Sequence, residues 1–484
     1  MKRKKSLGFN GLLNGVRSAL NLVFPLITFP YITRVLSVGS VGAYNFSNTY
    51  VGYFILLAGL GISTYAVREG AKYRDNREKL SKFASEIFAI NLWSTVVSYV
   101  LLFMSLLIFR NLQTYLLFIL IFSVQIFFTT VGIEWIYIIN EDYSYITARS
   151  IIFKIISIVM LFLLVKSRND YLWYAGITVF SSVGSNVLNY INANKICDIR
   201  LTTNINWKKH LKPIFIIFAS TLAVNIYLSS DTTILGIMKS DYDVGIYSIT
   251  VKIYNIVATL LGSVMTVTVP RLSMLMGQGK MKEYKETFIR VINVLALLVI
   301  PGTIGLMMLS QEIVLLIAGP KYLESTNALR IIGLAVIFSN FSFVFYNCVL
   351  IPAKREKQGL FNTIAAAIVN VLLNICLIPM FAYDGTSFST VVAEIMTTVM
   401  NFWAGKDIIK STVFSKRVIH NLFTVLIASI FVAISCWICK LIFASLLLRI
   451  GASVISSGIV YFVALVLLKN ELVVSKLKKI DDFT

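Results

Sequence analysis

Residues 84–108 read ASEIFAINLWSTVVSYVLLFMSLLI, a run of 25 residues in which Glu86 is the one charged side chain. A helix needs about 20 mainly apolar residues to cross the hydrocarbon core of a bilayer. Basic residues stand on both sides of this run, at Lys79, Lys82 and Arg110. The stretch therefore predicts a transmembrane helix, and the same hydropathy window can be moved along the rest of the chain.

Apolar runs of this kind recur throughout the 484 residues and predict about 14 transmembrane helices. The composition agrees, because 57% of the residues are hydrophobic and only 14% are charged. The predicted fold class is an all-α polytopic membrane protein, which excludes an ordinary cytosolic enzyme. The spans are expected near residues 12–33, 41–66, 84–108, 114–139, 146–165, 171–194, 213–237, 244–269, 290–309, 328–351, 360–379, 387–404, 420–443 and 451–468.

The net charge of +21 follows the predicted spans. Of the 44 Lys and Arg residues, 32 fall on segments that would share one side of the membrane with the N-terminus, and 8 fall on the opposite side. By the positive-inside rule, both termini are expected in the cytoplasm. We expect no nucleic-acid partner, because no basic stretch is long enough to form a separate domain with stacking aromatic residues.

The connections between the predicted spans are short, so no extramembrane domain is expected. An enzyme that acts on sugars at the surface needs loops large enough to hold catalytic groups around its substrate. No phosphate-binding G-x-x-x-x-G-K-[ST] run occurs either. The five Cys residues are too few for a disulfide scaffold. We therefore expect a protein that is not an enzyme and that carries no cofactor and no metal.

An internal repeat divides the chain. Val41-Gly42-Ala43-Tyr44 opens the second predicted span, and Val244-Gly245-Ile246-Tyr247 opens the eighth, 203 residues later. Six spans separate the copies, and an even number preserves their orientation in the membrane. The sequence predicts an N-terminal lobe of six spans (1–198), a C-terminal lobe of six spans (199–410) and two extra helices with a cytoplasmic tail (411–484).

Ionisable residues inside the predicted spans are the candidate functional residues, because a charge at the centre of a bilayer costs about 2.5–3.5 kcal/mol. A cleft between two lobes would hold them at the least cost. Cations outnumber acids, which favours an anionic cargo such as a pyrophosphate. The candidate cavity cations are Arg17, Arg34, Lys154 and Lys252, and the candidate acids for ion coupling or charge pairing are Asp231 and Glu394.

Structural alternatives stay open for each of these residues. Arg17 lies near the start of its span and can extend to the interface. Asp231 can pair with Lys252 or Arg34, and Lys154 and Glu394 can serve packing. Residues near span ends, Glu134 and Lys440, are expected to be solvated at the interface. The Asn residues at intramembrane positions are expected either to form hydrogen bonds between helices, the favoured interpretation for each, or to contact a polar cargo.

Several stretches, in their order and spacing, resemble a known family. The chain is similar to the polysaccharide flippases of the multidrug/oligosaccharidyl-lipid/polysaccharide exporter superfamily over nearly its whole length. The residues that carry the resemblance are Phe29-Pro30-Tyr31-Ile32-Thr33-Arg34-Val35-Leu36, Val41-Gly42-Ala43-Tyr44, Gly59-Leu60-Gly61, Ala66-Val67-Arg68-Glu69, Glu134-Trp135, Glu141, Tyr145, Arg149, Ser230-Asp231, Val244-Gly245-Ile246-Tyr247, Pro270-Arg271-Leu272-Ser273 and Gly319-Pro320-Lys321-Tyr322.

The resemblance implies a function and a place. It implies a flippase of the bacterial cytoplasmic (inner) membrane that moves undecaprenyl-pyrophosphate-linked oligosaccharide repeats to the outer leaflet, for capsule or O-antigen-like polymers. Membrane lipid surrounds it, and a polysaccharide polymerase and glycosyltransferases are candidate partners. The cavity arginines expected in lipid II flippases are not matched. Two alternatives remain: a drug/cation antiporter of the same superfamily, and a membrane-embedded polysaccharide polymerase or ligase.

Overall fold

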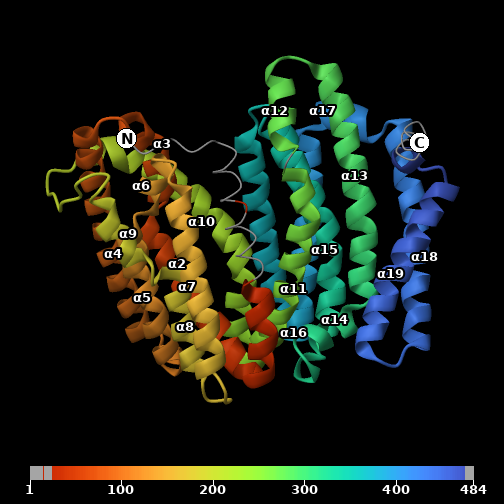
Figure 1. Cartoon of the computed structure of the whole chain (residues 1–484), viewed down its shortest axis with the longest axis horizontal. Coiled ribbons are helices and arrows are strands. Elements are labelled where there is room, and N and C mark those ends of the chain that lie inside the picture. The colour runs from red at the N-terminus through yellow and green to blue at the C-terminus, as the bar shows by residue number, and fades with distance from the viewer. Residues whose placement is uncertain (1–14, 16–23, 267, 475–484) are drawn as a thin grey trace. The chain divides into compact units, whose positions relative to one another are not determined.

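The computed structural model describes residues 15, 24–266 and 268–474. Every regular element in these ranges is a helix (Figure 1). Within them, eleven helices are long and apolar enough to cross a membrane by length and composition. The predicted all-α polytopic fold class is confirmed.

The chain forms two compact units. Unit 1 comprises residues 1–236 and 240–245, and unit 2 comprises residues 237–239 and 246–484. This division follows the packing of the helices and falls later than residue 198, where the repeat in the sequence places the end of the first lobe. The lobe boundaries at 198 and 410 stay predictions.

Unit 1 contains a helix over residues 24–35 and nine labelled α-helices. Helix α2 packs against α4 and α5, and α5 packs in turn against α8. Short 3-10 helices, η1 (Ala71–Tyr73) and η2 (Arg110–Tyr115), join some of them. The helices are α2 (Val38–Gly59), α3 (Ile62–Gly70), α4 (Arg77–Ile108), α5 (Leu116–Gly132), α6 (Glu134–Ile139), α7 (Tyr143–Leu164), α8 (Tyr171–Val183), α9 (Asn186–Ala193) and α10 (Trp207–Met238).

Unit 2 is built around α13, which packs against α15 on one side and α18 on another. Helices α18 and α19 pair closely with each other, as do α15 and α16. The elements are α11 (Asp241–Thr266), α12 (Val269–Gly277), α13 (Met281–Met308), α14 (Ser310–Ile317), the 3-10 helix η3 (Pro320–Tyr322), α15 (Ser325–Phe345), the π-helix η4 (Tyr346–Leu350), α16 (Glu356–Ala404), α17 (Lys406–Val413), α18 (Lys416–Ile442) and α19 (Leu446–Leu467).

The described residues contain eleven candidate spanning helices, whereas the sequence predicts fourteen spans. Helix α16 accounts for part of this difference, because it is a hairpin of two spans. Ala382 has φ 45° and ψ −126°, which is not a helical conformation. The Asn362 Nδ2 group donates to Asn401 Oδ1 at 2.9 Å, although residues 39 apart in a straight helix are separated by about 58 Å. The two arms therefore lie side by side, as expected for separate spans at 360–379 and 387–404.

The other two differences have local causes. The predicted span 12–33 falls partly outside the described residues. The predicted span 171–194 is divided into α8 and α9 at Gly184 and Ser185, so neither piece is long enough by itself. Left-handed residues also break two further predicted spans: Leu60 (φ 45°) separates α2 from α3, and Ile133 (φ 34°) separates α5 from α6.

The breaks leave backbone carbonyls without helical partners, and asparagine side chains satisfy them. Asn91 Nδ2 donates to Ala58 O at 2.7 Å, at the end of α2. Asn189 Nδ2 donates to Gly132 O at 2.8 Å at the end of α5, and Asn186 Nδ2 donates to Phe128 O, one turn earlier in α5, at 3.0 Å. An unsatisfied carbonyl in hydrocarbon is costly. The prediction of hydrogen bonds from intramembrane Asn residues between helices is confirmed at these positions.

The start of α11, residues 241–245, belongs to unit 1 and contacts the start of α2 there. Helices α2 and α11 begin 203 residues apart, at Val38 and Asp241. A Cβ atom on Gly42 would lie 1.7 Å from the Asp241 carbonyl oxygen, and one on Gly245 would lie 2.3 Å from that of Val38. The two contacts are reciprocal under the 203-residue offset. Both glycines are therefore required where the backbones approach each other most closely, and the repeat is structural.

Candidate functional site

The six candidate residues are distributed over both units. Arg17 lies outside the described residues. Arg34, Lys154 and Asp231 belong to unit 1, and Lys252 and Glu394 belong to unit 2. Each is therefore described within its own unit, and their assembly into one cation-lined cavity stays a prediction.

Arg34 ends the helix over residues 24–35 and is exposed. Its Nη1 donates to the Pro30 carbonyl at 2.6 Å, so the guanidinium folds back along its own helix. That helix is fixed to α7, because Tyr31 donates its hydroxyl proton to Val165 O at 2.6 Å and packs edge-on against Phe162. The position of Arg34 is thus set by the end of α7.

Lys154 lies on α7, half-buried, with Nζ 5.9 Å from the centroid of the Phe24 ring. Phe24 contacts α7 at residue 154 and Tyr31 contacts it at residue 162, so the two helices run parallel. Ten residues separate Phe24 from Arg34, about 15 Å along the axis. Lys154 and Arg34 thus provide positive charge at two depths along one pair of helices.

Asp231 is 8% exposed and lies beside Ser230 on α10. Two residues later on α10, Thr233 shares a hydrogen bond of 2.9 Å with the hydroxyl of Tyr53 of α2, and the Asp231 carboxylate lies close enough to Tyr53 to interact with it electrostatically. The buried carboxylate therefore lies in a polar contact between α2 and α10. Its expected pairing with Lys252 or Arg34 stays a prediction.

Lys252 lies on α11 and is half-buried. Thr250, two residues earlier, is fully buried and its hydroxyl donates to Ser325 O at the start of α15. Two residues correspond to about 200° of rotation around a helix. Lys252 therefore lies on the face of α11 turned away from α15, as expected for a residue that does not serve the packing of these two helices.

Glu394 is on the second arm of α16 and is half-buried. Thr398, one turn later on the same face, donates to both Glu394 O at 2.7 Å and Phe338 O of α15 at 2.8 Å. The face that carries Glu394 is therefore a packing face toward α15. A role of Glu394 in ion coupling or charge pairing stays a prediction.

Lys440 and Glu134, expected at span ends, are both half-buried and each lies beside an opposite charge; their solvation at the interface stays a prediction. Lys440 Nζ of α18 lies 2.8 Å from Glu312 Oε2, and Arg449 Nη1 of α19 lies 3.3 Å from Oε1. The contact between Lys440 and Glu312 is close enough to be an ion pair, but its angles are not those of a hydrogen bond. Glu134 Oε2 lies 3.6 Å from Nη2 of the buried Arg149.

Glu312 was not among the candidates, although its residue is only 1% exposed. It follows the predicted span 290–309 directly, which suggests an interfacial acid. The signal that could have identified it is the apolar run of residues 313–318 that comes next. The short helix α14 folds this run back into unit 2 and carries Glu312 inward.

A second buried polar group that sequence reasoning missed joins three helices of unit 1. Tyr65 Oη of α3 lies 2.7 Å from His210 Nδ1 of α10, and His210 Nε2 lies 3.0 Å from Glu86 Oε2 of α4. With Glu86 ionised, the geometry assigns Nε2–H as the donor to Glu86 and the Tyr65 hydroxyl as the donor to Nδ1. This chain of hydrogen bonds fixes the first turn of α10 against α3 and α4.

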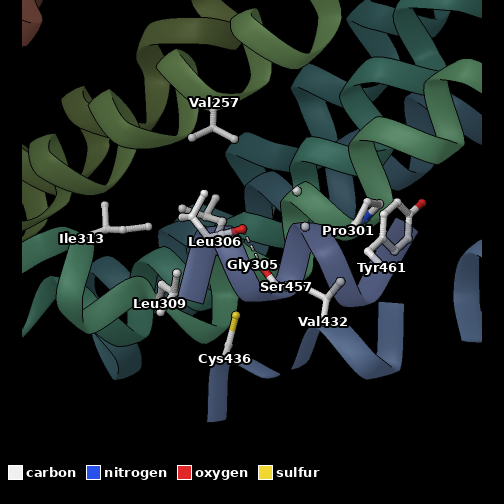
Figure 2. A pocket seen from close by; sticks show the side chains of 13 residues that line it. Val257, Pro301, Gly305, Leu306, Leu309, Ile313, Val432, Cys436, Ser457 and Tyr461 are labelled. Atoms are coloured by element: carbon white, nitrogen blue, oxygen red, sulfur yellow. Dashed lines mark hydrogen bonds between the residues drawn. The ribbon is translucent and has the colours of Figure 1, made fainter. Parts of the chain in front are cut away.

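A cavity of about 340 Å³ in unit 2 lies between α11, α13, α14, α18 and α19. Figure 2 shows Leu306, Leu309 and Ile313 on one side, with Val432, Cys436 and Tyr461 on another. Its lining is apolar apart from Ser457 and the Tyr461 hydroxyl, which donates to Leu297 O at 2.9 Å. No charged side chain lines it, so it does not suit a phosphate or a sugar headgroup.

Comparison with known proteins places this fold. A family model described as "Polysaccharide biosynthesis protein" matches residues 10–276, and one described as "MatE" matches residues 216–376. The chain is 23% identical over 408 residues to a putative O-antigen transporter of Escherichia coli K12, which covers 82% of this chain and 95% of that one. It is 25% identical over 177 residues to the probable flippase AglR of Haloferax volcanii, 35% of this chain and 36% of that one.

Solved structures share the architecture. The lipid II flippase MurJ in an inward closed conformation superposes with a TM-score of 0.77 at 15% identity, over 96% of this chain and all of that one. An inward-facing multidrug resistance MATE transporter superposes with a TM-score of 0.64 at 12% identity, over 83% and 96%. At these identities the likeness shows the fold alone. The relatives are named as transporters and flippases, which agrees with the prediction that this multi-pass membrane protein is not an enzyme.

Proposed function

Because this chain belongs to the polysaccharide biosynthesis protein family, we propose that it is a flippase that moves a lipid-linked oligosaccharide across the cytoplasmic membrane. The match of that family model over residues 10–276 carries the proposal. The O-antigen transporter relative, aligned over 82% of this chain, supports an oligosaccharide cargo. Both termini lie in the cytoplasm by the distribution of basic residues.

The cargo we propose is an undecaprenyl-pyrophosphate-linked repeat unit for a surface polysaccharide. A pyrophosphate accepts several charge-assisted hydrogen bonds at once. Lys154 and Arg34 offer cations at two depths of unit 1, and Lys252 offers one on a face of α11 that does not pack against α15. These three residues, with Arg17, are the proposed contacts of the anionic headgroup.

Transport proceeds by alternating access in this proposal. The headgroup enters from the cytoplasm while the polyprenyl chain stays in the lipid. Cavity cations replace part of its hydration, and the two lobes change their orientation to open outward. Asp231, buried in a polar contact between α2 and α10, is the proposed site of ion coupling or charge pairing.

A transport assay with purified protein tests the proposal. Liposomes receive the lipid-linked oligosaccharide on the inner leaflet, and a membrane-impermeant reagent measures its appearance outside. Lys252→Glu and Arg34→Glu should each reduce the rate at least tenfold, because a charge-assisted hydrogen bond contributes about 1.5–3 kcal/mol. Lys285→Glu, an exposed residue of α13, is the matched control and should leave the rate unchanged. Normal transport by both charge-reversed variants would refute the role of these cations.

A drug/cation antiporter is the second candidate, favoured by the match of the MatE model to residues 216–376. Acidic cavity groups suit that function better than basic ones. Deletion of the gene separates the two. Drug sensitivity with normal surface polymer supports an antiporter, whereas lipid-linked repeat units that accumulate on the inner face support a flippase.

A further inference from the structure

The short helix α17 lies at a membrane surface of unit 2. It follows the second arm of α16 and precedes α18, and both are candidate spans. Figure 1 shows it at the same end of unit 2 as α12 and opposite α14. A groove of about 830 Å³ runs beside it, lined among others by Phe402, Trp403, Lys406, Asp407, Lys410 and Phe414. A surface groove with aromatic side chains on one side and cationic side chains on the other suits a ligand that has an apolar part and an anionic part.

The aromatic side of the groove is exposed. Trp403 is 62% exposed and Phe414 is 59% exposed, at the end of α16 and just beyond α17. Phe402 contacts both rings, with centroids 6.4 Å and 6.1 Å away. Trp side chains favour the level of lipid headgroups, where the ring meets both hydrocarbon and water. This wall is therefore suited to the upper part of an acyl chain.

The charged side of the groove is positive. Lys406 and Lys410 lie one turn apart on α17 and are both exposed. The guanidinium of Arg355 donates two hydrogen bonds, of 2.7 and 2.8 Å, to the carboxylate of Asp407. Because this pair neutralises the one acid of the groove, the two lysines provide a local charge of about +2. Residues one turn apart are close enough to contact the same phosphate.

We propose that this groove binds one anionic phospholipid of the cytoplasmic leaflet, with its phosphate between Lys406 and Lys410 and an acyl chain along Phe402, Trp403 and Phe414. The positive charge of the two lysines complements an anionic phosphate, and the position of α17 between two spans favours a lipid over a soluble partner. A soluble acidic partner would have to cover aromatic rings that already lie at the level of the headgroups. The site depends on the proposed orientation of the chain and not on its cargo.

Fluorescence of Trp403 provides a direct test with the full-length protein. Phosphatidylglycerol with brominated acyl chains is titrated into phosphatidylcholine nanodiscs that hold the protein. The difference between wild type and Trp403→Phe isolates the signal of this one tryptophan. We expect brominated phosphatidylglycerol to quench it at a much lower mole fraction than brominated phosphatidylcholine. Equal quenching of Trp403 by both lipids overturns the proposal.

The lysines are tested with a matched control. Each lysine near an anionic surface contributes roughly fivefold to affinity, so Lys406→Gln with Lys410→Gln should weaken the lipid preference about 30-fold. Lys79→Gln with Lys82→Gln removes the same charge from the exposed start of α4 and should leave the curve unchanged. An unchanged quenching curve for the Lys406 and Lys410 double variant overturns the phospholipid site. So does an acidic peptide or a polyprenyl pyrophosphate that protects Trp403 from quenching by brominated phosphatidylglycerol more strongly than unlabelled phosphatidylglycerol does. Because no transport is measured, failure here leaves the proposed cargo untouched.

Discussion

Glu312→Gln should destabilise unit 2 more than Glu471→Gln, which removes a carboxylate from an exposed ion pair. The carboxylate has a side chain only 2% exposed, and it faces Lys440 and Arg449 from two different helices. Its loss leaves two cations in partly buried positions without a counter-charge. Breaking a buried ion pair costs about 3–5 kcal/mol. Lys440 and Arg449 are 20% and 28% exposed and recover some solvation, so the lower end, about 3 kcal/mol, applies.

The measurement is the apparent melting temperature of the purified protein in detergent. Unit 2 holds about 240 residues, for which each kcal/mol corresponds to about 2–4 °C by the scaling of soluble domains. The expected loss is therefore about 6–12 °C. The control is Glu471→Gln, which breaks an ion pair with Arg417 whose side chains are 43% and 47% exposed. An exposed pair contributes at most about 1 kcal/mol, so the control should lose less than about 4 °C.

A double-mutant cycle connects the loss to the ion pair itself. Lys440→Met in the Glu312→Gln background removes one of the two stranded cations and should restore part of the melting temperature. The coupling between the two positions should be at least about 1 kcal/mol. Equal melting temperatures for Glu312→Gln and Glu471→Gln, with no coupling to Lys440, would refute the buried-pair explanation.

Three further predictions follow from single contacts. Asn91→Leu should lower the free energy of unfolding by about 1 kcal/mol, because Ala58 O loses a hydrogen-bond donor. Asn293→Leu should be neutral or stabilising, because Asn293 makes no hydrogen bond with the described residues. Equal melting temperatures for the two variants would contradict this. Tyr65→Phe should cost about 1–3 kcal/mol by leaving His210 Nδ1 without a donor, and proteolysis near the start of α10 should become faster. Arg355 lowers the pKa of Asp407, so the stability that this ion pair provides should be constant above about pH 4 and decrease as the pH falls through the lowered pKa. An Asp407→Asn deficit that is as large at pH 3 as at pH 7 would contradict this.

The spans and the hairpin of α16 could be predicted from the sequence because they depend on local patterns. An apolar run of span length must form a helix in lipid, since no other single segment satisfies its own backbone. Pro379 and the short polar stretch after it divide the 49 residues of α16 into two such runs. The reversal at Ala382 follows from that division and needs no knowledge of distant residues.

The ionic contacts of unit 2 could not be predicted in the same way. Lys440 lies near a span end, and its sequence neighbourhood is compatible with solvation at the interface. Its contact with Glu312 depends on α14 folding back against α15 and α19, which places Lys440 Nζ and Glu312 Oε2, from residues 128 positions apart, 2.8 Å from each other. Hydropathy reports how deep a residue lies along one helix, but it does not report which other helix stands beside it. The same reason limits the candidate cations, whose depth is readable and whose neighbours are not.

The repeat shows where duplication in a sequence stops predicting duplication in structure. In the third and ninth predicted spans the repeat continues with a shift of one residue, so that Ile87, Ile90 and Asn91 match Ile289, Ile292 and Asn293. Both Asn residues are buried. Helix α2 ends at Gly59 because Leu60 adopts a left-handed conformation, and Asn91 satisfies the carbonyl of Ala58 that this break releases. Helix α11 continues to Thr266, past Gly262, the counterpart of Gly59. Helix α11 has no break there, and Asn293 makes no hydrogen bond with the described residues. The difference between these two Asn residues thus accompanies the break at Leu60, which the second copy lacks.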